Sequence, residues 1–154
     1  MTSSAPLLHT SCPLCGPAPA GLIWEDAQLR VILVDDSPFP GYIRVIWRDH
    51  ATEMTDLSPE ERDHLMRAVY RVEALQRRML QPDKINLASL GNQVPHLHWH
   101  LIPRWRSDPC FPDAIWAPAR HDPALQAAWQ RRAQELRSHT PALCDAITAA
   151  LGDT

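Results

Sequence analysis

Three histidines near the middle of the chain alternate with large apolar residues. His96, His98 and His100 are separated by a leucine and a tryptophan. In an extended strand successive side chains point to opposite faces, so the three imidazoles would project together, with neighbouring Cα atoms about 6.6 Å apart. A neutral imidazole offers one lone pair for attack on an electrophile, while its other nitrogen donates a hydrogen bond. The spacing therefore predicts a reactive face that carries three imidazoles, opposite an apolar face.

Two other interpretations of this pattern stay open at the level of spacing. The histidines could be ordinary residues on a solvated face of an antiparallel sheet. Three of them in register opposite large apolar residues make that the less favoured interpretation. Three imidazoles could also hold a catalytic zinc with one open coordination position. The spacing alone does not separate a zinc site from a nucleophile.

A second group of residues with metal-binding chemistry lies near the beginning of the chain. Cys12 and Cys15 form a Cys-x-x-Cys pair, while Cys110 and Cys144 are isolated. The pair has the short spacing of a zinc knuckle and needs two more ligands to complete a tetrahedral site. The alternatives are that the two cysteines are turn residues or a redox pair. This cysteine usage suits a reducing compartment rather than a disulfide framework.

Strands are predicted on both sides of one long helix, and they must position these groups. The segments 28–34 and 42–48 are rich in β-branched residues and enclose a turn-forming segment, which predicts two antiparallel strands. Two more strands are expected over 84–90 and 96–104, separated by a Gly-Asn turn. The last of these strands carries the histidines.

A long helix is predicted between the two pairs of strands. Ser58 is a capping residue, Pro59 occupies the first helical position and Glu61 completes a capping box. Pro82 prevents the helix from continuing. Apolar residues recur at helical spacing and predict the face that packs on the sheet: Leu65, Ala68, Val69, Val72, Leu75 and Met79. Two short helices are expected to open at Asp122-Pro123 and at Thr140-Pro141.

The length and charge balance of the chain limit its class. Its 154 residues fit one α+β domain over 12–154, with a core over 12–105, a C-terminal extension over 106–154 and a flexible tail over 1–11. Fifteen basic residues are scattered among eighteen acidic ones, which predicts no nucleic-acid partner. No stretch approaches the about 20 apolar residues of a membrane span, and the beginning of the chain lacks a signal-peptide pattern, so we expect a cytoplasmic protein without a membrane partner.

The segment PHLHWHLIP, residues 95–103, resembles the histidine-triad (HIT) signature, in which histidines alternate with apolar residues. The resemblance covers about residues 12–105 and is strongest toward a bacterial branch described as diadenosine-tetraphosphate-hydrolase-like. It implies a HIT-like fold: an antiparallel sheet of about five strands, with a long helix packed on it and a helical C-terminal tail. It also implies a nucleotide as the substrate and a homodimer as the common assembly.

The resemblance further implies roles for individual residues. His98 matches the nucleophile that attacks the α-phosphorus of a nucleotide and forms a covalent nucleotidyl-histidine, with His96 and His100 as catalytic neighbours. The implied nucleotide and phosphate ligands are Asn86, Gln93, His100 and Asp35. Asp36 is the alternative to Asp35 as the ligand of the ribose hydroxyls.

The chemistry implied in this way requires no cofactor, but a structural zinc is implied as well. Its ligands would be Cys12, Cys15, His50 and His96. Tyr42 stands where many relatives carry another histidine, and it cannot carry a positive charge near neutral pH. Arg104, directly after the motif, is interpreted as a solvated residue at a strand end.

A hydrolase of dinucleoside polyphosphates, nucleoside phosphoramidates or adenylated conjugates is the function that follows. The alternatives are a nucleotidyltransferase or phosphorylase of the same fold, and a nucleotide-binding module with structural zinc and no turnover. Relatives that transfer the nucleotide tend to carry glutamine at the third histidine position, so His100 favours hydrolysis. Trp116 and Arg120, in the C-terminal extension, are candidates for shaping substrate preference, because the tail of relatives often folds toward the active site.

Overall fold

Five strands form one antiparallel sheet in the order β1-β2-β3-β5-β4 in the computed structural model of the chain. The structure describes residues 9–17 and 20–152, so most of the predicted N-terminal tail lies outside the described residues. The strands are β1 (Leu22–Glu25), β2 (Leu29–Leu33), β3 (Ile43–Trp47), β4 (Lys84–Ser89) and β5 (His98–Arg104). The helices are a 3-10 turn (Met54–Asp56), α1 (Pro59–Leu80), α2 (Pro123–Ser138) and α3 (Thr140–Gly152). The predicted α+β fold class and antiparallel sheet are confirmed.

Two predicted boundaries and one strand differ from the sequence analysis. β1 has four residues, too few to show a strand pattern, and it was not predicted. β5 begins at His98 rather than at His96, because the Leu97 N–H donates outside the sheet ladder to the carbonyl of Ala51, at 2.7 Å. The helix that opens at Asp122 is not short: α2 has 16 residues.

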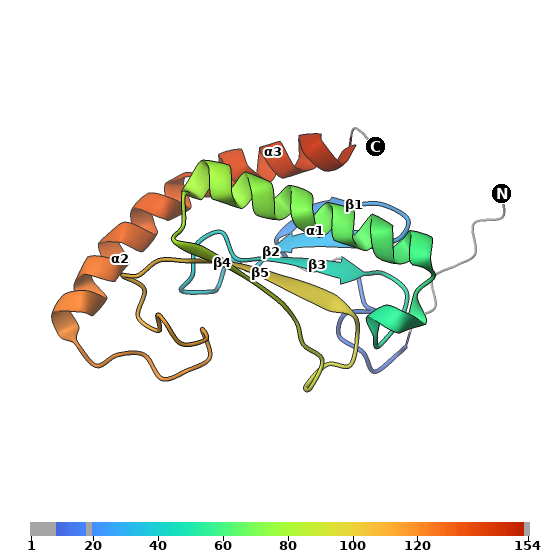
Figure 1. Cartoon of the computed structure of the whole chain (residues 1–154), viewed down its shortest axis with the longest axis horizontal. Coiled ribbons are helices and arrows are strands. Elements are labelled where there is room, and N and C mark those ends of the chain that lie inside the picture. The colour runs from blue at the N-terminus through green and yellow to red at the C-terminus, as the bar shows by residue number, and fades with distance from the viewer. Residues whose placement is uncertain (1–8, 18–19, 153–154) are drawn as a thin grey trace.

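One face of the sheet is packed against α1 and forms the core. Figure 1 shows α1 and α3 along the same side of the sheet. The apolar side chains of the central strands on this face are fully buried: Leu29, Val31, Ile43, Val45 and Leu101. The predicted stripe of α1 packs against them, which places the histidines of β5 on the opposite face.

α1 begins and ends where the sequence predicts. The Ser58 hydroxyl accepts from the Glu61 N–H, and the Glu61 carboxylate accepts from the Ser58 N–H, so both members of the capping box are formed. Gln76, on the buried side of α1, was not predicted to be in the core. Its amide donates to the carbonyls of Gly41 and Leu101, at 2.8 and 3.0 Å, and this pairing ties the helix to the sheet.

α3 covers α1 and β1 together. Leu143, Ile147 and Leu151 are buried in the core cluster. The Thr148 hydroxyl donates to the carbonyl of Ile23 in β1, at 3.1 Å, and Arg71 of α1 donates to the carbonyl of Ala150, at 3.0 Å. The end of the described chain is thereby fixed to its first strand. Within the described residues, no helix combines the length and the apolar character that a membrane crossing needs.

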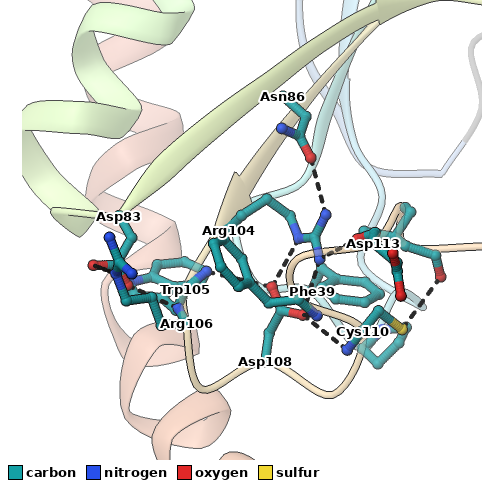
Figure 2. A network of polar contacts seen from close by, with 12 residues as sticks. Phe39, Asp83, Asn86, Arg104, Trp105, Arg106, Asp108, Cys110 and Asp113 are labelled. Atoms are coloured by element: carbon teal, nitrogen blue, oxygen red, sulfur yellow. Dashed lines mark hydrogen bonds and ion pairs between the residues drawn. The ribbon is translucent and has the colours of Figure 1, made fainter. Parts of the chain in front are cut away.

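Arg104 is buried, which corrects the prediction that it is solvated. Only 2 % of the side chain is exposed, and its guanidinium forms two bonds to the Asp108 carboxylate, at 2.7 and 3.0 Å. Figure 2 shows that the same group also reaches Asn86 and the main chain of Asp113. Arg104 therefore fixes the loop after β5 against the sheet.

Candidate active site and metal centre

His98 and His100 line one cavity of about 300 Å³ on the open face of the sheet. β5 pairs with β3 so that His100 lies opposite Arg44 and His98 opposite Ile46. Both imidazoles are at least nine-tenths buried, and their ring centroids are 4.7 Å apart. The remaining lining residues are Leu14, Leu90, Gly91, Asn92, Gln93, Val94 and Trp116.

The proton of neutral His98 lies on Nδ1. That atom is 2.6 Å from the main-chain carbonyl oxygen of His96, and a carbonyl oxygen can only accept a hydrogen bond. Nδ1 must therefore be the donor, which leaves the lone pair on Nε2. His98 has the tautomer that a nucleophile needs, with its second nitrogen held by a fixed acceptor.

His100 is held by a side chain rather than by the main chain. Its Nδ1 lies 2.5 Å from the hydroxyl of Tyr42, which also receives a hydrogen bond from Arg44 Nε, at 3.3 Å. A hydroxyl that donates to Nδ1 leaves the proton of neutral His100 on Nε2. In that arrangement His98 offers a lone pair to the cavity and His100 offers a donor.

Burial keeps both imidazoles neutral near neutral pH. It is the largest cause that lowers the pKa of His98, and the positive charge of Arg44 adds to it. Burial also lowers the pKa of His100 to about 4, with further contributions from His98 and Arg44. The Nε2 lone pair of His98 is consequently not consumed by a proton under ordinary conditions.

We expect the free energy of unfolding to fall as the pH is lowered from about 6.5 to about 4. The folded pKa of His100 is about 4, below the ordinary value of 6.5, so the unfolded chain binds more protons in this window. A shift of this size predicts a loss of about 2 kcal/mol between about pH 7 and pH 5 from this residue alone. Urea unfolding at the two pH values measures it. In His100→Gln the loss should be smaller by that amount, and an unchanged pH dependence would contradict the assignment.

His96 does not share the cavity with its two neighbours. Its ring is fully buried, and Nε2 donates to the carbonyl of Trp47, at 2.6 Å. Nδ1 therefore carries the lone pair, and it lies 3.4 Å from the sulfur atoms of both Cys12 and Cys15. The strand assignment begins only at His98, and His96 is not among the residues that line the cavity. His96 reaches the active site through its main-chain carbonyl instead.

The four predicted zinc ligands lie together. Donor atoms of Cys12, Cys15, His50 and His96 are all within 4.8 Å of one another. The sulfur-to-nitrogen distances are 3.3 and 3.4 Å. A sulfur and a nitrogen that both bind one tetrahedral zinc ion would lie about 3.5 Å apart, so the two sets of distances agree. Burial raises the pKa of the Cys15 thiol and lowers that of His96. The donor set fits zinc, which would stabilise the thiolate form of such a buried cysteine.

The other predicted ligands are divided among three hollows. Gln93 lines the cavity of His98. Asn86 does not: its amide oxygen accepts from Arg104, at 2.9 Å, and it lines a neighbouring cavity that shares Trp116 with the first. Asp35 is exposed and lines a third hollow, which shares Arg44 with the cavity of His98.

Arg44 and Leu14 are site residues that the sequence analysis missed. Alternation along β3 puts Arg44 on the same face as Tyr42, a signal that was present once the strand was predicted. Leu14 lies between the two cysteines and gave no signal of its own. Trp116 lines the cavity as its prediction suggested, with its ring 5.6 Å from that of His100 and nearly perpendicular to it.

The fold and the site together define a histidine-triad protein, in which a histidine-rich segment enters the central part of an antiparallel sheet. The family model of the HIT domain matches residues 16–107. The chain belongs to the HIT family, as the resemblance of its motif implied.

Two curated proteins are similar in sequence to this chain over part of their length. It is 28% identical over 101 residues to the bis(5'-nucleosyl)-tetraphosphatase (asymmetrical) of Schizosaccharomyces pombe, a match over 62% of this chain and 56% of that protein. It is 29% identical over 85 residues to an uncharacterized HIT-like protein of Saccharolobus solfataricus, over 51% of this chain and 61% of the relative. The chain thus spans less than two thirds of the length of either curated relative.

Solved structures share the fold over most of the chain. A histidine triad protein from Bradyrhizobium japonicum has a TM-score of 0.58 at 29% identity, with 77% of this chain and 89% of that chain covered. A zinc-bound histidine triad family protein from Mycobacterium smegmatis has a TM-score of 0.56 at 27% identity, with 88% and 97% covered.

Proposed function

We propose that this HIT protein is a nucleotide hydrolase. It cleaves a dinucleoside polyphosphate, a nucleoside phosphoramidate or an adenylated conjugate at the α-phosphorus, through a nucleotidyl-His98 intermediate. The observation that carries the proposal is the hydrogen bond of His98 Nδ1 to the His96 carbonyl oxygen, which leaves the lone pair on His98 Nε2. The neighbouring His100 is held at Nδ1 by Tyr42, and in the proposed mechanism its Nε2 carries the proton. The similarity to a tetraphosphatase supports the choice of substrate class.

The proposed reaction has two displacement steps. In the first, the Nε2 lone pair of His98 bonds to the α-phosphorus while the bond to the leaving group breaks, and its electron pair departs with that group. The positive charge on the ring is stabilised by the hydrogen bond from Nδ1 to the carbonyl oxygen of His96. In the second, water adds to the phosphorus, the bond to His98 breaks, and a proton is released with the nucleoside monophosphate.

Negative charge that develops on the phosphoryl oxygens would meet two groups of the cavity. The Nε2–H of His100 donates from one side, and the guanidinium of Arg44 lies opposite it across the β3–β5 pair. Gln93 lines the same cavity and supplies a further amide. Preorganised donors of this kind stabilise a transition state more than a ground state.

Asn86 and Asp35 keep proposed roles away from the attacked phosphorus. Asn86 is engaged by Arg104, so we assign it to supporting the loop beside the cavity. Asp35 remains the proposed ligand of the ribose hydroxyls, because its hollow adjoins the cavity at Arg44. A zinc ion bound by the four predicted ligands would supply structural stabilisation and no step of the reaction. The homodimer stays a prediction, which sedimentation equilibrium tests.

The proposal is tested by rapid-quench assays with a panel of dinucleoside polyphosphates and nucleoside phosphoramidates. A covalent nucleotidyl protein should form and decay at rates that account for turnover, with the label on His98. Transfer of the nucleotide to added phosphate instead of water would identify a phosphorylase. Nucleotide binding without a covalent species or product would identify a binding module and contradict the proposal.

Tyr42→Phe is expected to lower kcat by about tenfold. The variant removes the hydroxyl that directs a hydrogen bond to Nδ1 of His100, so that ring loses the partner that fixes its tautomer. A buried hydrogen bond of about 1.4 kcal/mol corresponds to this factor. Tyr70→Phe is the matched control, because Tyr70 is 56% exposed on α1, and its kcat should not change. Equal kcat values for the two variants would contradict the role of Tyr42.

A further inference from the structure

The cluster of Cys12, Cys15, His50 and His96 shares two structural connections with the active site. His96 contributes its ring to the cluster and its main-chain carbonyl to Nδ1 of His98. Leu14 lies between the two cysteines of the cluster and lines the cavity that contains His98. The same short segments therefore build the cluster and part of the active site.

The position of the His96 carbonyl depends on a small set of contacts around the cluster. The ring of His96 is held at both nitrogens, by Trp47 at one and by the cysteine sulfurs at the other. The following peptide is held by the Leu97 N–H, which donates to Ala51, at 2.7 Å. Trp47 and Ala51 flank His50, which is itself a cluster residue, 3.3 Å from the sulfur of Cys15. If the four cluster residues become less ordered, the peptide between His96 and Leu97, which bears this carbonyl, is therefore expected to change position.

Besides the cluster, the described part of the segment that carries Leu14 is attached by main-chain hydrogen bonds and by the ring of His9, which stacks on that of His50 with centroids 5.0 Å apart. Arg30 of β2 donates to the carbonyl of Gly16, at 2.7 Å, and fixes the end of the segment. Within it, the Cys15 N–H donates to the Cys12 carbonyl and closes a turn. Bonds from both cysteines to one ion would hold this turn against the sheet, and with it the apolar wall that Leu14 provides.

We propose that the Cys12–Cys15–His50–His96 cluster, when it holds zinc, positions the active site as well as the fold: through the His96 carbonyl it fixes the orientation and tautomer of His98, and through Leu14 it fixes one wall of the cavity. His96 is thus a positioning residue and not a catalytic one. The inference rests on the proposed nucleotide hydrolase for its kinetic consequence, but its structural consequence is independent of any substrate.

The test compares zinc-loaded protein with His50→Ala and with wild type from which zinc has been removed by a chelator. Nitrogen-15 NMR of the imidazoles at about pH 8, where they are neutral, reports the tautomer of His98. We expect one Nδ1–H tautomer in the zinc-loaded protein and a mixture after either treatment. Single-turnover formation of the nucleotidyl protein should slow by about tenfold or more, as for loss of other supporting contacts at metal sites.

Three further variants separate positioning from general stability. His50→Cys retains a fourth ligand and should restore zinc, the His98 signal and the rate. Leu143→Ala, at a fully buried position of α3, should lower the melting temperature and leave the His98 signal unchanged. Leu14→Ala should raise KM and leave zinc content and the His98 tautomer unchanged.

The outcomes distinguish this inference from the proposed function. A zinc-loaded wild type that turns over no substrate defeats the hydrolase proposal, while the NMR comparison still tests the positioning. An unchanged His98 tautomer and single-turnover rate after zinc removal would overturn the positioning, as would a protein that binds no zinc at the cluster.

Discussion

His98→Ala is expected to lower kcat at least about 10⁴-fold, the scale of losses when a covalent nucleophile is removed. The variant removes the Nε2 lone pair, while Arg44, His100 and Gln93 still line the cavity. Nucleotide binding should therefore persist, within about tenfold of the wild-type Kd. Rapid-quench assays should detect no nucleotidyl protein, and calorimetry of the variant with a nucleoside monophosphate measures the retained binding.

His121→Ala is the control for this experiment. His121 is exposed in the loop before α2 and has no role in the cavity. Its kcat should equal that of wild type. Retained turnover in His98→Ala, or an adenylated residue other than His98 in the wild type, would show that the nucleophile has been assigned to the wrong side chain.

Arg104→Ala is expected to lower the free energy of unfolding by about 3–5 kcal/mol, the cost of breaking a buried ion pair at one partner. Asp108 is fully buried, and its carboxylate would lose both bonds from Arg104. The main-chain N–H groups of Cys110 and Phe111 would still donate to it, but it would lose the guanidinium that is bonded directly to it. Urea unfolding monitored by tryptophan fluorescence measures the loss.

Arg106→Ala is a matched control two residues along the chain. Its side chain is 80% exposed, and its ion pair with Asp83 spans 3.7 Å. A surface pair of this kind contributes about 1 kcal/mol or less. Similar losses in the two variants would mean that the Arg104 network of Figure 2 does not hold the loop in place.

The main elements of the fold were predictable because their signals are local. The capping box at Ser58 and the stop at Pro82 bound α1, and β-branched residues on both sides of a turn-forming segment marked β2 and β3. β1 was not predictable in the same way. Its four residues form a strand because β2 pairs with them and α3 covers them, and both are tertiary effects.

The part of the site that depends on residue type and on the two-residue alternation of a strand was predictable from the sequence. The alternation places His98 and His100 together in the cavity, but it does not show that the ring of His96 lies in the cluster with Cys12 and Cys15. The burial of Arg104 also lies beyond sequence patterns, because its partner Asp108 is in a loop without periodicity. Contacts between a strand and an irregular loop depend on the folded chain as a whole.

The attachment of α3 to β1 has a consequence for the order in which the protein is made. Residues 140–152 follow β1 by more than a hundred positions, and Thr148 bonds to Ile23 across that separation. During translation the part of the apolar surface of α1 and β1 that α3 covers stays exposed until α3 has emerged from the ribosome. Nascent chains that pause before that point expose this surface, so we expect them to bind chaperones or to aggregate.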